Sequence, residues 1–292
     1  MSELSPRIGS GWLRATLFFI VSFIASQIFA GIGLVVVLLA TGFDLNALSN
    51  QEEISNAVKG VNFLLPLKII EFLSVMLCVW LFVRFIDRKP LESIGLILKG
   101  YENDLRLGLG LGAGMISIGF LILFILGILC VDGFSFPIIS IILYLALFIV
   151  VSFHEEIMMR GYVLNNLMQS MNRYAALSIS SVIFMSIHLL NPNVSFLSVV
   201  NLFLAGIVLG IYYMHKQNLW LPIGIHLTWN FFQGPIFGFE VSGIETDNII
   251  SQSITGNEII TGGAFGFEGS IIATILIAVS YTHLTLPTKR IV

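Results

Sequence analysis

The chain has 292 residues, of which 57% are hydrophobic and only 11% are charged, and its formal net charge is −3. The few charges are spread out rather than clustered, so we expect no nucleic-acid partner. Its two cysteines give neither a disulfide framework nor a metal-ligand spacing. Apolar stretches of membrane-spanning length recur along the whole chain and predict an all-α, polytopic transmembrane helical bundle.

About eight helices are predicted from these apolar stretches, and the last one is truncated. In chain order they cover residues 12–41, 62–86, 105–131, 136–160, 174–190, 195–214, 219–235 and, as a fragment, 269–279. The first stretch is too long for the apolar core of a secretory signal and has no cleavage site after it. No strand is expected, because open sheet edges cannot face lipid and no segment alternates like a barrel strand.

The predicted helices divide the chain into four regions. Residues 1–135 form N-terminal transmembrane helices, and residues 136–235 form a core that carries most of the polar side chains inside apolar sequence. Residues 236–279 form an extracytoplasmic loop and the partial last helix. Residues 280–292 read like a translated sequencing adapter, so we exclude them from the fold and expect the eighth helix to be cut short.

Basic residues predict the orientation, because cytoplasmic loops carry an excess of Lys and Arg. The N-terminal flank and alternate connections hold Arg7, Arg14, Arg84, Arg88, Lys89, Lys99, Arg106, Arg173 and Lys216. The opposite connections hold Asp44, Glu52 and Glu53 against Lys59, and then Glu240, Glu245, Asp247, Glu258 and Glu268. We therefore expect an integral protein of a bacterial plasma membrane with its N-terminus in the cytoplasm.

Glu155 and Glu156 closely follow the almost uninterrupted apolar stretch from Phe136 to Phe153. A carboxylate at bilayer depth is costly and usually faces a polar cavity, a partner or a catalytic centre. The alternative is that the helix has already left the membrane there. Glu156 precedes Arg160 by four residues, so we expect them to pair on one helix face. Glu155, rotated about 100° away, is the freer carboxylate and can take a proton from water.

Two histidines and an amide follow in later predicted helices. His226 and Asn230 are four residues apart and share a helix face, as do Phe184 and His188. A single buried histidine is more often structural than functional, but this group together with two glutamates favours a site. Hydrolysis of a peptide bond needs such groups, because water must be deprotonated, the oxyanion stabilised and the leaving amine protonated.

Other intramembrane chemistries lack their motifs. Met158 occupies the position where an H-E-x-x-H zinc helix needs its second histidine, and no G-x-S-x-G elbow is present. A secondary transporter is a second alternative, but the two halves show no repeat of interrupted helices. Lys68 and Glu71 are three residues apart and are interpreted as a self-satisfied pair near a helix end rather than as a transport site.

Three motifs of this chain resemble a known family. Glu155-Glu156-x-x-x-Arg160-Gly161, Phe184-x-x-x-His188 and His226-x-x-x-Asn230 are similar, in order and spacing, to those of the CAAX prenyl endopeptidase and bacteriocin-processing family, also called CPBP or Abi. The likeness covers about residues 136–235. It implies an intramembrane metalloendopeptidase whose helical core opens to the cytoplasm. A non-catalytic scaffold or bacteriocin-immunity protein of the same fold is the alternative, although no motif residue is lost.

The resemblance also implies a role for each motif residue. Glu155 would be the general base, and His188 would help to bind or activate the water. His226 and Asn230 would stabilise the oxyanion, supported by Glu156 and Arg160. The family is generally described as metalloproteases, which implies Zn²⁺ with Glu155, His188 and His226 as candidate ligands, although a ligated Glu155 could not also be the free base. The implied partners are the lipid bilayer and a peptide or protein substrate, with or without an attached lipid.

Helix lengths raise one difficulty for this site. His188 lies about 21 Å along its predicted helix from Tyr174, whereas His226 lies only about 10 Å into its own helix from the same side. Two straight helices that start at the same membrane level would therefore hold the two histidines at different depths. These depths can be reconciled if the helices over 136–160 and 174–190 project beyond the bilayer on the cytoplasmic side.

Overall fold

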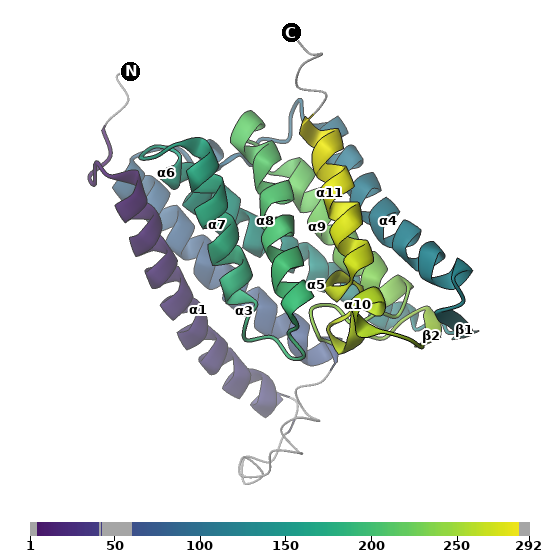
Figure 1. The fold of residues 1–292 in the computed structure, drawn as a ribbon. Helices are drawn as coiled ribbons and strands as arrows, with labels where there is room; N and C mark the ends of the chain where they lie inside the picture. The colour runs from purple at the N-terminus through teal and green to yellow at the C-terminus, as the bar shows by residue number, and fades with distance from the viewer. Residues whose placement is uncertain (1–4, 41, 43–59, 286–292) are drawn as a thin grey trace.

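The computed structural model describes residues 5–40, 42 and 60–285 and shows a bundle of helices (Figure 1). Its long helices are α1 (Gly11–Ala40), α3 (Val61–Leu81), α4 (Glu102–Ile125), α5 (Ile138–Glu156), α7 (Arg173–Ile187), α8 (Phe196–Lys216), α9 (Trp220–Phe231) and α11 (Ile271–Thr285). The predicted all-α bundle is confirmed. The predicted loop charges Asp44, Glu52, Glu53 and Lys59, and the adapter-like residues 286–292, lie outside the described residues.

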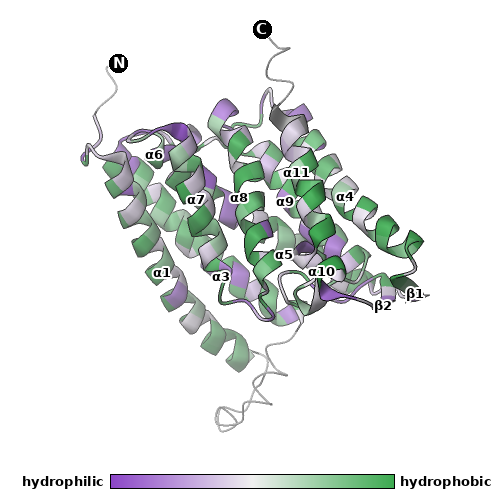
Figure 2. Ribbon diagram, in the orientation of Figure 1, coloured by the Kyte–Doolittle hydropathy of each residue, from purple (hydrophilic) through white to green (hydrophobic). Residues whose placement is uncertain are grey.

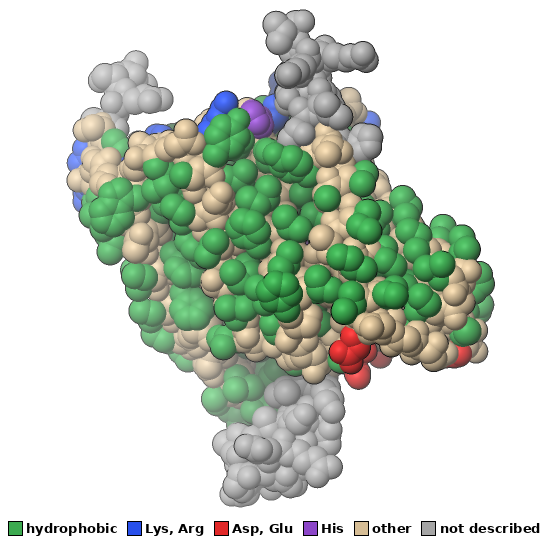
Figure 3. All heavy atoms as spheres, viewed as in Figure 1, with side chains coloured by type: hydrophobic (Ala, Val, Ile, Leu, Met, Phe, Trp, Pro, Cys, Tyr) green, Lys and Arg blue, Asp and Glu red, His purple; other side chains and the backbone are tan. Residues whose placement is uncertain are grey.

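Five stretches of the described chain are long and apolar enough to cross a membrane: Gly11–Ala40, Val61–Asp87, Glu102–Ile125, Ile138–Leu167 and Phe196–Lys216. α7 and α11 are apolar but shorter. Hydrophobic residues predominate along the helices in Figure 2, and in Figure 3 apolar side chains cover the visible face between a basic end and an acidic end. An apolar outer face between two charged ends is typical of an integral membrane protein.

α5 continues without a break through a π-helical segment, η4 (Ile157–Leu164), into α6 (Asn165–Leu167), so it extends beyond the predicted end at 160. All eight residues of η4 are buried. A wider π turn is rare within helices and often occurs at functional sites. α3 and α9 also end in π-helical turns, η2 (Phe82–Asp87) and η5 (Phe232–Ile236).

The expectation that the chain contains no strand is wrong. β1 (Leu129–Phe134) pairs antiparallel with β2 (Ile250–Ile254), and β1 includes residues that were predicted to be the end of the helix over 105–131. α4 stops early because Gly127 adopts a positive φ of 68°, which is incompatible with a continuing helix. The two strands pair with each other beside the end of α4 (Figure 1), so this ribbon does not cross the bundle.

Arg14 is not the solvated flanking charge that the sequence suggested. Its side chain is 1% exposed, and one guanidinium nitrogen lies 3.0 Å from the Asp87 carboxylate while another donates to Gln169. The partners come from η2 and from the segment after α6, which are distant in sequence. This buried ion pair therefore joins α1 to two other elements near the basic end of the bundle.

Glycines of α4 allow α9 to lie in the middle of the bundle, between α4 and α5. A Cβ atom added to Gly108 would overlap the carbonyl oxygen of Leu221, and one added to Gly112 would overlap that of Ile225. Gly110 and Gly114, on the other face of α4, meet no atom within 4 Å. The packing role thus belongs to alternate glycines of this run, which let two helix backbones approach closely.

We expect Gly112→Val to destabilise the protein by about 1–3 kcal/mol, because its side chain would force α4 away from α9. Gly110→Val is the matched control, since it adds the same side chain to the same helix where nothing lies within 4 Å. Unfolding of the purified protein in detergent with increasing SDS measures both effects. Equal loss of stability in the two variants would contradict this account of the helix contact.

The connection between η5 and α11 is an ordered cap rather than a simple loop. It contains β2, α10 (Glu258–Thr261) and two 3₁₀ turns, η6 (Gly263–Phe265) and η7 (Phe267–Gly269). Phe265 and Phe267 are at most 1% exposed, so the cap inserts two aromatic rings among the helices. α11 follows the cap and continues past the predicted end at 279 to Thr285.

Candidate active site

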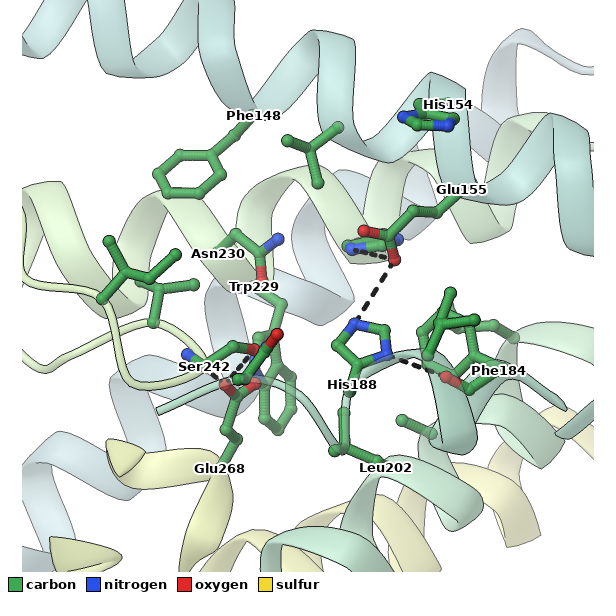
Figure 4. A pocket seen from close by; sticks show the side chains of 18 of the residues that line it. Phe148, His154, Glu155, Phe184, His188, Leu202, Trp229, Asn230, Ser242 and Glu268 are labelled. Atoms are coloured by element: carbon green, nitrogen blue, oxygen red, sulfur yellow. Dashed lines mark hydrogen bonds and ion pairs between the residues drawn. The ribbon is translucent and has the colours of Figure 1, made fainter. Parts of the chain in front are cut away.

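A cavity of about 320 Å³ lies within the bundle, among α3, α5, α7, α8, α9 and the cap. Most of its lining is apolar. Its polar lining includes Glu155, His188, His226, Asn230, Ser242 and Glu268, which come from α5, the end of α7, α9 and the cap. Figure 4 labels all of these residues except His226. Polar side chains that converge in an otherwise apolar cavity are typical of ligand-binding and active sites.

Glu155 lies in the last turn of α5 and faces two imidazole rings. Its Oε2 atom lies 3.6 Å from Nε2 of His188 and 3.8 Å from Nε2 of His226. These separations exceed a direct hydrogen bond, and this buried oxygen has no hydrogen-bond partner. Polar groups at this separation are commonly bridged by water. The carboxylate that the sequence left unpaired is therefore positioned against both histidines.

His188 caps the C-terminal end of α7, and its ring orientation is set by its own helix. Nδ1 lies 2.8 Å from the carbonyl oxygen of Phe184. A carbonyl oxygen can only accept, so Nδ1 carries the hydrogen and donates it. In the neutral ring the lone pair is then on Nε2, which faces Glu155. The Phe184-x-x-x-His188 spacing therefore fixes which nitrogen is available in the cavity.

Glu156 orients His226 and pairs with Arg160. Its Oε1 atom lies 2.9 Å from the Arg160 guanidinium, so the predicted pair is present, and 3.0 Å from Nδ1 of His226. The Arg160 side chain is 1% exposed, lies 4.3 Å from the Phe184 ring centroid and also donates to the carbonyl oxygen of Gly206. Because Nδ1–H of His226 donates to Glu156, the neutral ring directs its Nε2 lone pair toward Glu155.

Three acceptors consequently converge in the cavity: one carboxylate oxygen of Glu155 and the two imidazole Nε2 atoms. No donor lies between them, and three acceptors repel one another unless they share a proton or a bridging donor. A water molecule supplies two such donors. The arrangement can therefore bind water and accept one of its protons, which is the first requirement of hydrolysis.

Asn230 lies one turn after His226 on α9, is 8% exposed and lines the same cavity. Its amide supplies N–H donors, which the other motif side chains in the cavity lack in their neutral forms. His154, which had no assigned partner in the sequence, also lines the cavity and is 9% exposed. The predicted pair of Lys68 and Glu71 forms at 2.7 Å on the α3 side of the same cavity.

Sequence reasoning missed two features of the site. Glu268 was predicted only as a loop acid, but η7 places it in the cavity with 9% exposure, where it accepts hydrogen bonds from Ser242. The contact between Glu156 and His226 was also missed, because 70 positions separate them. One signal for Glu268 was available in the sequence. It lies between Gly266 and Gly269 and follows the aromatic residues Phe265 and Phe267, which is unusual for a solvated loop.

The depth difficulty does not prevent the site from forming. α7 ends at Ile187, and His188 lies just beyond it, yet both His188 and His226 are within 4 Å of the same Glu155 oxygen. The assumption that both helices are straight and start at the same level therefore gave the wrong relative position of the two histidines. Whether α5 and α7 project beyond the bilayer stays a prediction.

The predicted zinc ligands Glu155, His188 and His226 do not form a preformed metal site. Across residues 5–40, 42 and 60–285, no group of three or more His, Cys, Asp and Glu side chains is arranged to hold a metal ion. The 3.6 and 3.8 Å between Glu155 and the two imidazoles are wider than the roughly 3.3 Å between ligand atoms of a tetrahedral zinc. Zinc binding stays a prediction.

Residues 137–232 match the model of one protein family, described as type II CAAX prenyl endopeptidase, Rce1-like. The matched segment starts just before α5 and ends at the start of η5, so it contains all eight motif residues. The cap, Ser242 and Glu268 lie beyond it. No curated protein and no solved structure matches the chain.

Proposed function

We propose, from the premise that this chain belongs through residues 137–232 to the Rce1-like family of type II CAAX prenyl endopeptidases, that it is an intramembrane endopeptidase. One observation carries the proposal: Glu155 faces the Nε2 atoms of His188 and His226 inside a largely apolar cavity. That arrangement is suited to activating water for attack on a peptide carbonyl.

The first step uses Glu155 as the general base. A water molecule between Glu155 and His188 donates one hydrogen to the carboxylate and one to the imidazole Nε2, and its oxygen lone pair faces the substrate. Glu155 accepts the proton as the oxygen attacks the carbonyl carbon. Holding water and base together in this way contributes typically 100- to 10,000-fold to the rate.

The second requirement is stabilisation of the oxyanion that forms on the carbonyl. Asn230 can donate an amide N–H to it. His226 can do so only as an imidazolium, with one N–H directed to Glu156 and the other to the oxyanion. The Glu156 carboxylate stabilises that charged ring, and the Arg160 guanidinium pairs with the same carboxylate oxygen. This chain of contacts gives the predicted supporting residues a physical role.

The proposed orientation places the basic end of the bundle in the cytoplasm. On the face seen in Figure 3, Lys and Arg side chains gather at one end of the bundle. The positive-inside rule places such a basic end in the cytoplasm. The proposed substrate is a peptide or protein segment that enters the cavity from the membrane. The apolar lining, which includes Phe148, Met115 and Leu202, suits apolar side chains or an attached lipid.

A non-catalytic scaffold or immunity protein of the same fold is the second candidate, and a secondary transporter is less well supported. Nothing about scaffolding requires two imidazoles and a carboxylate to converge with their acceptor atoms facing a cavity. The concentration of intramembrane charge on one site also differs from the distribution across two halves expected of a transporter. The geometry therefore supports the enzyme.

The proposal is tested with purified protein in liposomes and a fluorogenic peptide library. We expect the wild type to cleave members of the library, and His226→Ala to lower kcat/KM by at least about 100-fold, because it loses a donor to the oxyanion. His215→Ala is the matched control, since this exposed histidine lies at the end of α8 away from the cavity. Absence of wild-type cleavage across the library would overturn the protease proposal.

The same assay tests the zinc prediction separately. Exhaustive treatment with a chelator followed by addition of Zn²⁺ abolishes and restores cleavage if a metal is required. Elemental analysis of the same sample verifies that bound zinc has been removed. Unchanged cleavage in that sample would refute the zinc requirement but not the proposed roles of Glu155 and the histidines.

A further inference from the structure

Glu268 is held in the cavity from outside the family-matched segment. Its backbone carbonyl accepts a hydrogen bond from the Asn201 side chain of α8 at 2.8 Å, and the same amide donates to Ser270 at 2.8 Å. Thr274 in turn donates to the Asn201 side-chain oxygen at 2.7 Å. The helices α8 and α11 therefore fix the turn that carries this carboxyl group.

Glycines and one aromatic ring fix the same turn from its other side. Gly262 and Gly266 adopt positive φ angles of 93° and 101°. A Cβ atom on Gly262 would overlap the carbonyl oxygen of Gly266, and one on Gly266 would overlap that of Glu240. The Phe267 ring packs where Gly119 of α4 leaves room. The chain thus specifies the position of residue 268 through several independent contacts.

The carboxyl group itself has one bonded and one free oxygen. Oε1 accepts hydrogen bonds from both the backbone N–H and the hydroxyl of Ser242, the latter at 2.6 Å. Oε2 accepts no hydrogen bond from Ser242. The Glu268 side chain lines the cavity. Burial raises the pKa of Glu268, and this effect exceeds the opposing contributions of Ser242, His188 and His226. A buried carboxyl without a cationic partner favours its neutral, proton-bearing form.

Peptide hydrolysis also requires a proton donor for the leaving amine. In the proposed mechanism Glu155 and His188 hold the attacking water and His226 faces the oxyanion, while the amine must receive a proton as the carbon–nitrogen bond breaks. Figure 4 shows Glu155 and Glu268 reaching the cavity from different sides, with Glu268 beside Ser242. Two carboxyl groups in different surroundings, one bonded by hydroxyl and amide donors, can divide the base and acid roles.

We propose that Glu268 donates the proton to the leaving amine and then stays beside it as a carboxylate. This inference rests on the proposed peptidase function. Water gives a proton to Glu155 and its oxygen bonds to the carbonyl carbon. The carbon–nitrogen bond then breaks with its electron pair on nitrogen, which takes the proton of Glu268. Glu155 ends protonated and Glu268 ionised, so transfer of one proton between them, through water or the departing amine, restores the starting state.

The test compares two substrates that share one acyl part. One is a peptide amide identified from the library, and the other is its 4-nitrophenyl ester, whose leaving group departs without a proton. We expect Glu268→Gln to lower kcat/KM for the amide by roughly 100-fold and for the ester by less than about fivefold. Gln keeps an oxygen that accepts both Ser242 hydrogen bonds. Glu245→Gln, an exposed carboxylate of the same cap, is the matched control and is expected to change neither rate.

A structural role for Glu268 makes a different prediction. It would lower amide and ester cleavage equally, and Ser242→Ala, which removes one hydrogen bond but keeps the carboxyl, would lower the amide rate as much as Glu268→Gln does. Either result overturns the proposal, as does full amide activity in Glu268→Gln. We expect Ser242→Ala to keep amide cleavage within about fivefold of wild type, because the proton donor is still present. Failure of the wild type on both substrates instead defeats the peptidase function itself.

Discussion

Replacing Glu155 with Gln is expected to lower kcat/KM for peptide cleavage by roughly 100- to 10,000-fold while the protein stays folded. Gln has the same shape and hydrogen-bonding oxygen but cannot accept a proton from water. Within the described part of the chain, Glu155 is the carboxylate that faces both the His188 and the His226 ring. Its loss therefore removes the base and leaves the positions of both imidazoles intact.

The expected loss extends to both leaving groups. Because water must be deprotonated before either an amide or an ester is attacked, Glu155→Gln should slow the peptide and its 4-nitrophenyl ester alike, unlike Glu268→Gln. Glu258→Gln, an exposed glutamate in α10, is the control for loss of a negative charge. Steady-state kinetics in liposomes and SDS unfolding of the same samples provide the two readouts. Full peptidase activity in Glu155→Gln would refute the proposed mechanism.

Replacing Arg160 with Met is expected to destabilise the protein by about 3–5 kcal/mol. Glu156 is fully buried and would lose the guanidinium 2.9 Å from its Oε1 atom, which leaves a buried carboxylate with only His226 as a partner. Met fills much of the space over the Phe184 ring, so the loss reflects charge rather than a large cavity. SDS unfolding in detergent gives the difference in stability.

The double variant Glu156→Gln with Arg160→Met separates the charge effect from packing. Removing both charges together is much less costly than leaving one buried and unpaired, so the double variant should recover much of the stability lost in Arg160→Met. Arg106→Met provides a control at an exposed arginine of α4. If Arg160→Met is as stable as the wild type, the pair does not hold the site in the way inferred here.

Local patterns predicted much of this molecule because they depend on residues close in sequence. Apolar length placed the long helices, since a spanning helix must bury its own backbone hydrogen bonds. The four-residue spacing of Glu156 and Arg160 predicted an ion pair that forms. For the glycines of α4, only the structure shows that Gly108 and Gly112 meet α9 and that Gly110 does not.

Features that depend on distant residues could not be read in this way. In the sequence, Arg14 is one of the basic residues of the N-terminal flank. Only the fold shows that Asp87 and Gln169 lie beside it. The β1–β2 ribbon joins segments more than a hundred residues apart and ends a helix that apolar composition would have continued. The rise per residue along each isolated helix placed His188 and His226 at different depths, because this calculation ignores how neighbouring helices are shifted along their axes.

The sequence by itself determined the membrane class, the helical frame and the motif residues, because hydrophobicity and helical period are local properties. Only the tertiary structure decided which acceptor atoms face one another and that Glu156 bonds to both Arg160 and His226. It also brought Glu268 from an apparent outer loop into the cavity. Such contacts depend on packing among helices and a glycine-rich turn far apart in the chain, and hydrophobic pattern carries no information about them.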